Sequence, residues 1–414
     1  MLNVSDRSRL RSLAARQAEI AASEPMRRLY GEWRLHGAFD RAARPMVTVE
    51  LWTFAEEIIP SMLACRSERA REIESQLLMA VAPHTLFHDD TPVRSYYPVA
   101  LHERFVPFGL QVRKHVADPS GGAGVGHRFE GYLTDLERDY GKLGKSLFHI
   151  DLDATRREME ELDAIFGDIL PVRRGGEPIM VAAAEDIIHL IDMQHLYLAL
   201  LDTPDLVHAM MERLLLDYGL YLDALEQTGL HATANDEALP QGSYCFNARL
   251  PGEGTHLTTH DLWGYMDAEE FNDVSPAMYK AFIIDHYIPF ARRFGALSFG
   301  CCEAIHRVWD GCVENLPNLA KVSVSAWCDQ RFMGERLCGR DIVFLRKPTA
   351  NLLGLSGALE EDAVRAHFDE TARAASGCRL EVSQRDVYRV DGGTARVRRY
   401  VALIRESLDR CWKP

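Results

Sequence analysis

Chemically reactive side chains follow three short strand-like runs in the segment 295–348. The groups are Cys301, Cys302 and Glu303 after the run 296–299, Trp327 and Asp329 after the run 322–325, and Arg346 and Lys347 after the run 341–345. Thiolates and carboxylates are ligands for zinc, and a carboxylate also serves as a general acid or base. A cationic pair at a strand end recognises anions. The three groups together therefore indicate a metal or acid–base site with an anion anchor.

The elements between these runs decide whether the three groups meet. Segments of helical length, 303–314 and 329–337, separate the strands, and the second begins at Asp329, a residue type that caps helix N-termini. Strand, helix and strand in succession predict parallel βαβ units. In a (β/α)8 barrel the carboxyl ends of such strands share one mouth, which holds the active site. We therefore expect Cys301 and Arg346 to converge, although they lie 45 positions apart (346 − 301 = 45).

Composition narrows the classes of function. The chain has 414 residues, 47% of them hydrophobic, and a net charge of −14 with acidic and basic residues interspersed, which argues against an extended nucleic-acid interface and favours a small-molecule partner. Nine cysteines without a secretory signal predict reduced thiols in the cytoplasm. No run of about 18 apolar residues is present, so we expect no membrane span.

Helix signals organise the rest of the chain. Residues 1–44 are rich in Ala, Arg, Leu and Glu, which predicts an N-terminal helical extension, and residues 45–414 form the predicted barrel beginning with the strand 47–52. Ser275 followed by Pro276 predicts the N-cap and first residue of the helix that precedes the central segment.

The sequence resembles the uroporphyrinogen decarboxylase superfamily, and within it a branch related to corrinoid-dependent methyltransferases. The residues that carry the resemblance are Asp261-Leu262-Trp263-Gly264, Phe271 with Val274-Ser275-Pro276, Gly300-Cys301-Cys302-Glu303, Pro317-Asn318-Leu319 with Val322-Ser323-Val324-Ser325, and Arg346-Lys347-Pro348. The resemblance implies a distorted (β/α)8 TIM barrel with extra N-terminal helices. The arginine-bearing N-terminal motif of true uroporphyrinogen decarboxylases is absent.

The resemblance also implies a cofactor and partners. Methyltransferases of this superfamily hold zinc through a His-x-Cys strand end and a later cysteine. Here Gly300-Cys301-Cys302 stands at the His-x-Cys position, without the histidine, and Cys378 is similar to the later ligand, so Cys301, Cys302 and Cys378 are the implied metal ligands. No cobamide-binding Asp-x-His-x-x-Gly motif is present, so a corrinoid would be supplied by a partner protein. A homodimer is expected from the family alone.

Each candidate residue has a functional and a structural interpretation. Successive side chains of a strand alternate sides, so we expect one of the two adjacent cysteines to face the mouth and the other to join the core. Catalytic candidates are Glu303, His306 and Asp329, and substrate-binding candidates are Trp263, Glu270, Trp327, Arg346 and Lys347. Glu303 and Asp329 are also plausible helix caps, and Arg346 with Lys347 is also consistent with a solvated face.

Three functions follow from these residues. The leading hypothesis is a zinc-type methyltransferase that moves a methyl group between a small-molecule substrate and a corrinoid protein or thiol acceptor. The alternative is a metal-independent decarboxylase or lyase of a small carboxylated substrate other than uroporphyrinogen III. A third interpretation is a non-enzymatic barrel, which a mouth filled with apolar side chains would support.

Overall fold

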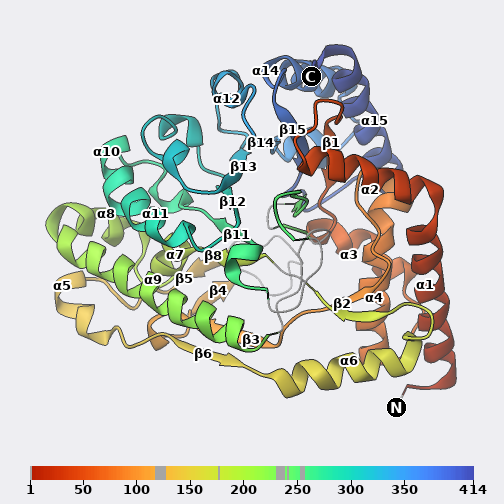
Figure 1. Cartoon of the computed structure of the whole chain (residues 1–414), viewed down its shortest axis with the longest axis horizontal. Helices are drawn as coiled ribbons and strands as arrows, with labels where there is room; N and C mark the ends of the chain where they lie inside the picture. Colours follow the sequence, from red (N-terminus) through yellow and green to blue (C-terminus); the bar gives the residue numbers. More distant parts are fainter. Residues whose placement is uncertain (1, 117–126, 176–177, 230–237, 240–241, 252–256) are drawn as a thin grey trace.

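The computed structural model describes residues 2–116, 127–175, 178–229, 238–239, 242–251 and 257–414. Its central element is one sheet of seven parallel strands in the order β1-β15-β14-β13-β12-β11-β8 (Figure 1). The strands are β1 (Met46–Val49), β8 (Ile179–Val181), β11 (Trp263–Met266), β12 (Ala296–Phe299), β13 (Leu319–Val324), β14 (Val343–Arg346) and β15 (Arg379–Gln384). Mixed α/β architecture with parallel pairing is confirmed, whereas a closed ring of eight strands is not found among the described residues.

Helices lie on both sides of the sheet (Figure 1). They are α1 (Val4–Ala22), α2 (Glu24–Gly37), α3 (Ala55–Ile58), α4 (Glu68–Ala82), α5 (Leu136–Asp139), α6 (Leu152–Phe166), α7 (Ala183–Ile188), α8 (Met193–Asp202), α9 (Pro204–Gln227), α10 (Pro276–Tyr279), α11 (Asp285–Ala291), α12 (Gln330–Leu337), α13 (Asn351–Gly354), α14 (Glu361–Ala374) and α15 (Gly393–Cys411). In Figure 1, α1, α2 and α4 lie on one side of the molecule with α15, and α8 to α11 lie on the other. No helix of the described residues has both the length and the apolar character needed to cross a membrane.

Short pairs of strands lie outside the main sheet. They are β2 (Tyr97–Val99) with β7 (Val172–Arg174), β3 (Glu103–Val106) with β6 (Leu147–Ile150), β4 (Lys114–Val116) with β5 (His127–Phe129), and β9 (Ala238–Leu239) with β10 (Ser243–Tyr244). Only the first of these pairs is parallel.

Two helix starts follow the sequence signals. The Ser275 side chain accepts a hydrogen bond from the Met278 amide with Pro276 as the first residue of α10, and Asp329 caps α12. The predicted helix over 303–314 is wrong, because only two short 3-10 turns, Ile305–Arg307 and Val313–Asn315, form there.

The register of the parallel strands sorts side chains onto two faces. Ser323 pairs with Leu345 and Leu345 with Glu381, so these three point to the same side, and residues two positions away in each strand do the same. We call the side that carries Thr48, Ser323 and Glu381 the inner face. The opposite, outer face carries Val324, Arg346 and Val382, which pair with one another in register and face α14 and α15.

A buried polar network covers the amino end of the inner face. Lys321 forms an ion pair with Glu381 at 2.8 Å, and the side chains of both residues are less than 5% exposed. The Lys321 ammonium also donates to Ser243 Oγ and to the Tyr244 carbonyl, and the Trp263 indole donates to the Cys245 carbonyl at 2.6 Å. The segment 242–245 is thereby fixed across the inner face and forms a floor beneath the carboxyl ends of the strands.

Replacing Glu381 by Leu should destabilise the fold strongly, because Lys321 would stay buried without its counter-ion. We expect a loss of about 3–5 kcal/mol in the free energy of unfolding, measured by urea denaturation. The matched control is Asp285→Asn, which breaks the half-exposed ion pair with Lys280 and should cost at most about 1 kcal/mol. Equal losses in the two variants would show that the floor network does not depend on this pair.

Candidate metal and anion site

Two thiols and a carboxylate converge at the carboxyl ends of β11 and β12. The ligand atoms of Glu269, Cys301 and Cys302 all lie within 4.8 Å of one another, and the two sulfurs are 3.6 Å apart. Glu269 is exposed and both cysteines are half-buried, so the cluster opens to solvent on one side. The sequence-based convergence of groups after successive strands is therefore found for these residues.

The expectation that one cysteine faces the mouth and the other joins the core is wrong. Strand β12 ends at Phe299, and Gly300 has a φ of 98°, a left-handed conformation suited to glycine. Because the chain leaves the extended conformation there, the alternation of side chains no longer applies to Cys301 and Cys302. The turn brings both sulfurs to the same side.

Glu303 holds this turn together and is buried. Its carboxylate accepts hydrogen bonds from the Cys301 amide at 2.5 Å and from the Ala268 amide at 3.3 Å, so it joins the segments that follow β12 and β11. Burial raises the pKa of Glu303. The structure gives Glu303 a positioning contact with Cys301, and the predicted catalytic role stays a prediction.

Lys347 approaches the same turn from β14. Its ammonium donates to the Cys301 carbonyl at 2.8 Å, and Ser323 Oγ donates to the same oxygen at 2.7 Å. Burial lowers the pKa of Lys347, whereas the thiols oppose that shift. The hydrogen bond between the sulfurs raises the pKa of Cys301 and lowers that of Cys302, so Cys302 is the thiol that ionises first.

Two buried carboxylic acids lie behind the exposed Glu269. Asp267 accepts a hydrogen bond from Tyr265 Oη at 2.7 Å, and burial raises its pKa to about 8. Burial raises the pKa of Glu270 to about 9. One oxygen of each, Asp267 Oδ1 and Glu270 Oε2, has no hydrogen-bond partner within the described part of the chain. Both acids are therefore protonated near neutral pH. Glu270 follows Glu269 directly in the chain, and its predicted substrate-binding role stays a prediction.

Arg385 and Glu50, which follow β15 and β1, add charge to the carboxyl edge of the sheet. Glu50 Oε2 lies 3.6 Å from Arg385 Nε, and both side chains are about nine-tenths buried. Among the described residues this edge therefore carries several ionisable groups, which the non-enzymatic interpretation does not predict.

Three predicted site residues lie elsewhere. Cys378 precedes β15 at the amino end of the sheet, where its thiol donates to the Gly334 carbonyl at 3.4 Å, so it cannot join ligands that follow the carboxyl end of β12. Trp263 begins β11 and is buried at the floor. Arg346 lies on the outer face, where its guanidinium donates to the Val324 and Ser325 carbonyls. These three predictions are wrong, because each residue lies at the wrong end or on the wrong face of its strand.

The remaining candidates lie at the rim around α12. Asp329 Oδ1 accepts from the amides of Arg331 and Phe332, which is the capping role, and the Asp329 amide donates to His306 Nδ1 at 3.2 Å. Trp327 is 75% exposed. No hydrogen bond or ion pair among the described residues joins these side chains to the cysteines, so their catalytic and substrate-binding roles stay predictions.

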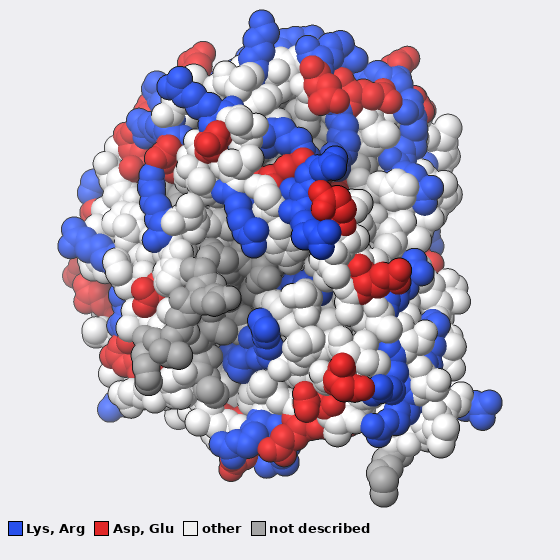
Figure 2. Space-filling model, turned by 45° about the vertical axis from the view of Figure 1, so that its right-hand side comes forward, with Lys and Arg blue, Asp and Glu red and all other residues white. Residues whose placement is uncertain are grey.

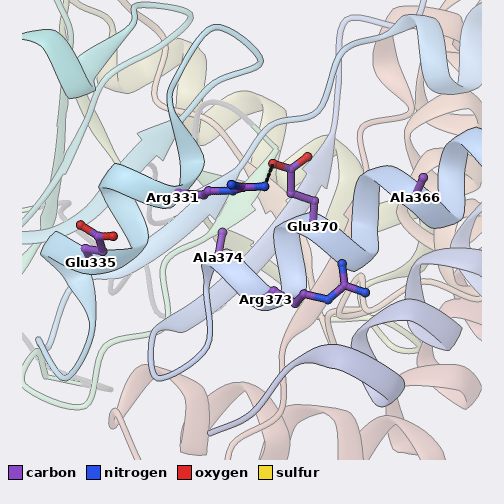
Figure 3. A pocket seen from close by; sticks show the side chains of 6 residues that line it. All are labelled: Arg331, Glu335, Ala366, Glu370, Arg373 and Ala374. Atoms are coloured by element: carbon purple, nitrogen blue, oxygen red, sulfur yellow. Dashed lines mark ion pairs between the residues drawn. The ribbon is translucent and has the colours of Figure 1, made fainter.

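A separate groove between α12 and α14 contributes nothing to this chemistry. Two of its charged side chains, Arg331 and Glu370, form an ion pair of 3.2 Å, which Figure 3 shows. On the face that Figure 2 shows, acidic and basic side chains are intermixed.

Zinc fits the donor set of Glu269, Cys301 and Cys302. Two thiolates bound tetrahedrally at the usual zinc–sulfur distance of about 2.3 Å would lie about 3.8 Å apart, close to what the sulfurs already show. The observed separation is 3.6 Å. Three protein ligands would leave a fourth position open, as in catalytic zinc sites. The fit requires no contribution from Cys378.

Comparisons with known proteins add little to this geometry. No family model matches the sequence, and no curated protein matches it. Among solved structures, a methyltransferase from Methanosarcina mazei aligns with a TM-score of 0.49 and 13% identity, over 92% of this chain and 98% of that chain. Identity and score are both too low for this likeness to indicate a shared activity.

Replacing Gly300 by Ala should disturb the cysteine turn. A Cβ there would lie 2.3 Å from Ile305 Cδ1 and 3.2 Å from Ser323 Cβ, in addition to the strain of a φ of 98°. Gly357→Ala is the matched control, because Gly357 has a φ of 91° and nothing within 4 Å. We expect Gly300→Ala to lose about 1–3 kcal/mol more than the control in thermal unfolding. Equal losses would mean that the turn tolerates the methyl group.

Proposed function

We propose that the chain is a zinc-dependent methyltransferase that moves a methyl group between a small-molecule substrate and a corrinoid protein or thiol acceptor. The observation that carries the proposal is the convergence of Glu269, Cys301 and Cys302 at the carboxyl edge of a parallel sheet, which is where α/β enzymes bind their ligands. Zinc bound there would supply a Lewis acid that keeps a thiol or water deprotonated at neutral pH.

The surrounding residues would support such a site in two ways. Lys347 offsets negative charge, because two thiolates and a carboxylate give −3, the metal ion +2 and the ammonium +1, for a sum of zero. Glu303 and Ser323 hold the backbone of Cys301 at its amide and its carbonyl. These contacts fix the direction of the ligands before a substrate arrives.

Asp267 and Glu270 would serve as proton donors at this site. With pKa values raised to about 8 and 9, each carries a proton near neutral pH. A protonated carboxylic acid of that kind can donate its proton to a leaving group. The corrinoid would arrive on a partner protein, because the sequence has no cobamide-binding motif of its own.

The metal itself is the first test. We expect about one zinc per chain in the purified protein by elemental analysis, as for a single catalytic site. Cys301→Ser and Cys302→Ser should each lose the zinc, and Glu269→Gln should weaken its retention during dialysis against a chelator. Cys378→Ser is the control and should keep the metal. Zinc that persists in both variants of the adjacent cysteines would rule out this site.

The reaction is the second test. The zinc-loaded chain is mixed with methylcobalamin and small thiols, and loss of the methylcobalamin absorbance is followed. We expect turnover that needs zinc and falls at least about tenfold in Cys302→Ser, because a ligand of the activating metal is removed. The alternative is a metal-independent decarboxylase or lyase, which the protonated acids Asp267 and Glu270 favour. Carbon dioxide released from a small carboxylic acid by the metal-free chain, without methyl transfer, would establish that alternative.

A further inference from the structure

Two cations follow neighbouring strands of the sheet. Lys347 and Arg385 are the first residues after β14 and β15, and burial, together with the charge of the nearby Arg385, lowers the pKa of Lys347. Lys347 contacts the Cys301 carbonyl, and Arg385 lies beside Glu50 at the same carboxyl edge. Lys347 is 3% exposed and the Arg385 side chain 12%. Buried cations of this kind require anionic or hydrogen-bonding partners.

The Arg385 guanidinium is only partly satisfied. Nε and Nη1 are buried and have no hydrogen-bond partner within the described part of the chain. The nearest carboxylates are Glu50, 3.6 Å from Nε and therefore beyond hydrogen-bond distance, and Asp386, 3.1 Å from Nη2. Glu50 Oε2 is likewise unpartnered among these residues. A guanidinium binds a carboxylate through parallel N–H donors, and unsatisfied buried donors favour such a ligand.

The backbone beside Arg385 is held in an unusual conformation. Asp386 has a φ of 59°, in the left-handed region that aspartate tolerates better than most residues. This turn ends the strand and brings the Asp386 carboxylate against Nη2 of Arg385. The guanidinium is thereby anchored at one nitrogen, while the other two nitrogens keep unused donors.

The cations lie next to the thiols. Lys347 contacts the Cys301 carbonyl directly, and the charge of Arg385 favours ionisation of Cys302. Arg385 was not predicted from sequence as a site residue, and it takes the place that we had assigned to Arg346.

We propose that Arg385 and Lys347 form an anion subsite that binds the carboxylate of the small-molecule substrate and positions the rest of that molecule over Cys301 and Cys302. The inference deepens the proposed function by giving the charge of the substrate, and it rests on that function only for the location of the reacting centre. In this subsite Glu50 is the counter-ion of Arg385 before substrate binds, and the substrate carboxylate supplements or displaces it.

The test compares two alkylating reagents of similar size, of which one is an anion and the other is neutral. Iodoacetate and iodoacetamide each form a carbon–sulfur bond with a cysteine thiolate and release iodide, and the thiol proton goes to solvent. Rates at Cys301 and Cys302 are measured by mass spectrometry on the full chain in the presence of a chelator. We expect the ratio of iodoacetate to iodoacetamide rates to fall about tenfold in Arg385→Gln, because the nearby positive charge is lost.

Arg389→Gln is the matched control. It removes the same charge four residues away, from a side chain that is 78% exposed, and should leave the ratio unchanged. If Arg385 has only a structural role, its substitution alters both rates alike and leaves the ratio as in Arg389→Gln, which would overturn the inference.

A second measurement uses the unaltered chain and so does not depend on folding of a variant. Propionate should protect the two cysteines from iodoacetamide, and the neutral propionamide should not; equal effects of the two compounds would overturn the inference.

Failure of the anion subsite can be distinguished from failure of the proposed function. Zinc binding with no effect of propionate refutes the subsite alone, and propionate protection in a chain that never binds zinc refutes the zinc methyltransferase alone.

Discussion

The register of the parallel strands is the constraint on which the rest of the structure depends. It places charged residues at two levels of the sheet, Lys321 with Glu381 near the amino ends, and Lys347 with Arg385 near the carboxyl ends. At the lower level the Lys321 ammonium has Glu381, Ser243 and a carbonyl as partners, so that network is complete and structural. At the upper level buried donors and acceptors remain unused among the described residues. Fully satisfied buried groups stabilise a fold, whereas unsatisfied ones at a strand edge beside reactive thiols leave donors and acceptors for a ligand.

Gly300 shows how a single backbone position can create a site. In an extended strand Cys301 and Cys302 would point to opposite sides, and two thiols 3.6 Å apart would not form. The left-handed turn removes that restriction, and the Glu303 carboxylate keeps the turn closed by accepting from the Cys301 amide. The same turn would let both sulfurs bind one metal ion with little rearrangement.

Sequence reasoning predicted the strands well and the faces poorly. The strand-like run 296–299 coincides with β12, and the capping signals at Ser275 and Asp329 begin α10 and α12, since both patterns are local. Arg346 and Cys378 were misplaced because face and strand end depend on register with neighbouring strands, which a single sequence does not contain. Arg385 was missed for a related reason, because it follows β15, which ends at Gln384. The side chain that follows a strand is identified only when the strand's true end is known.

The distribution of charge at the upper level limits the chemistry that the site can perform. Glu269, the two thiols and a bound divalent ion would leave one negative charge, which Lys347 neutralises. Arg385 is then balanced in part by Glu50, at a distance too long for a hydrogen bond. A neutral substrate would leave that guanidinium unsatisfied, whereas a carboxylate would complete its donors. The guanidinium is already desolvated by the fold, because its side chain is 12% exposed. The electrostatics of the mouth therefore favour an anionic substrate whether the reaction at the thiols is methyl transfer or decarboxylation.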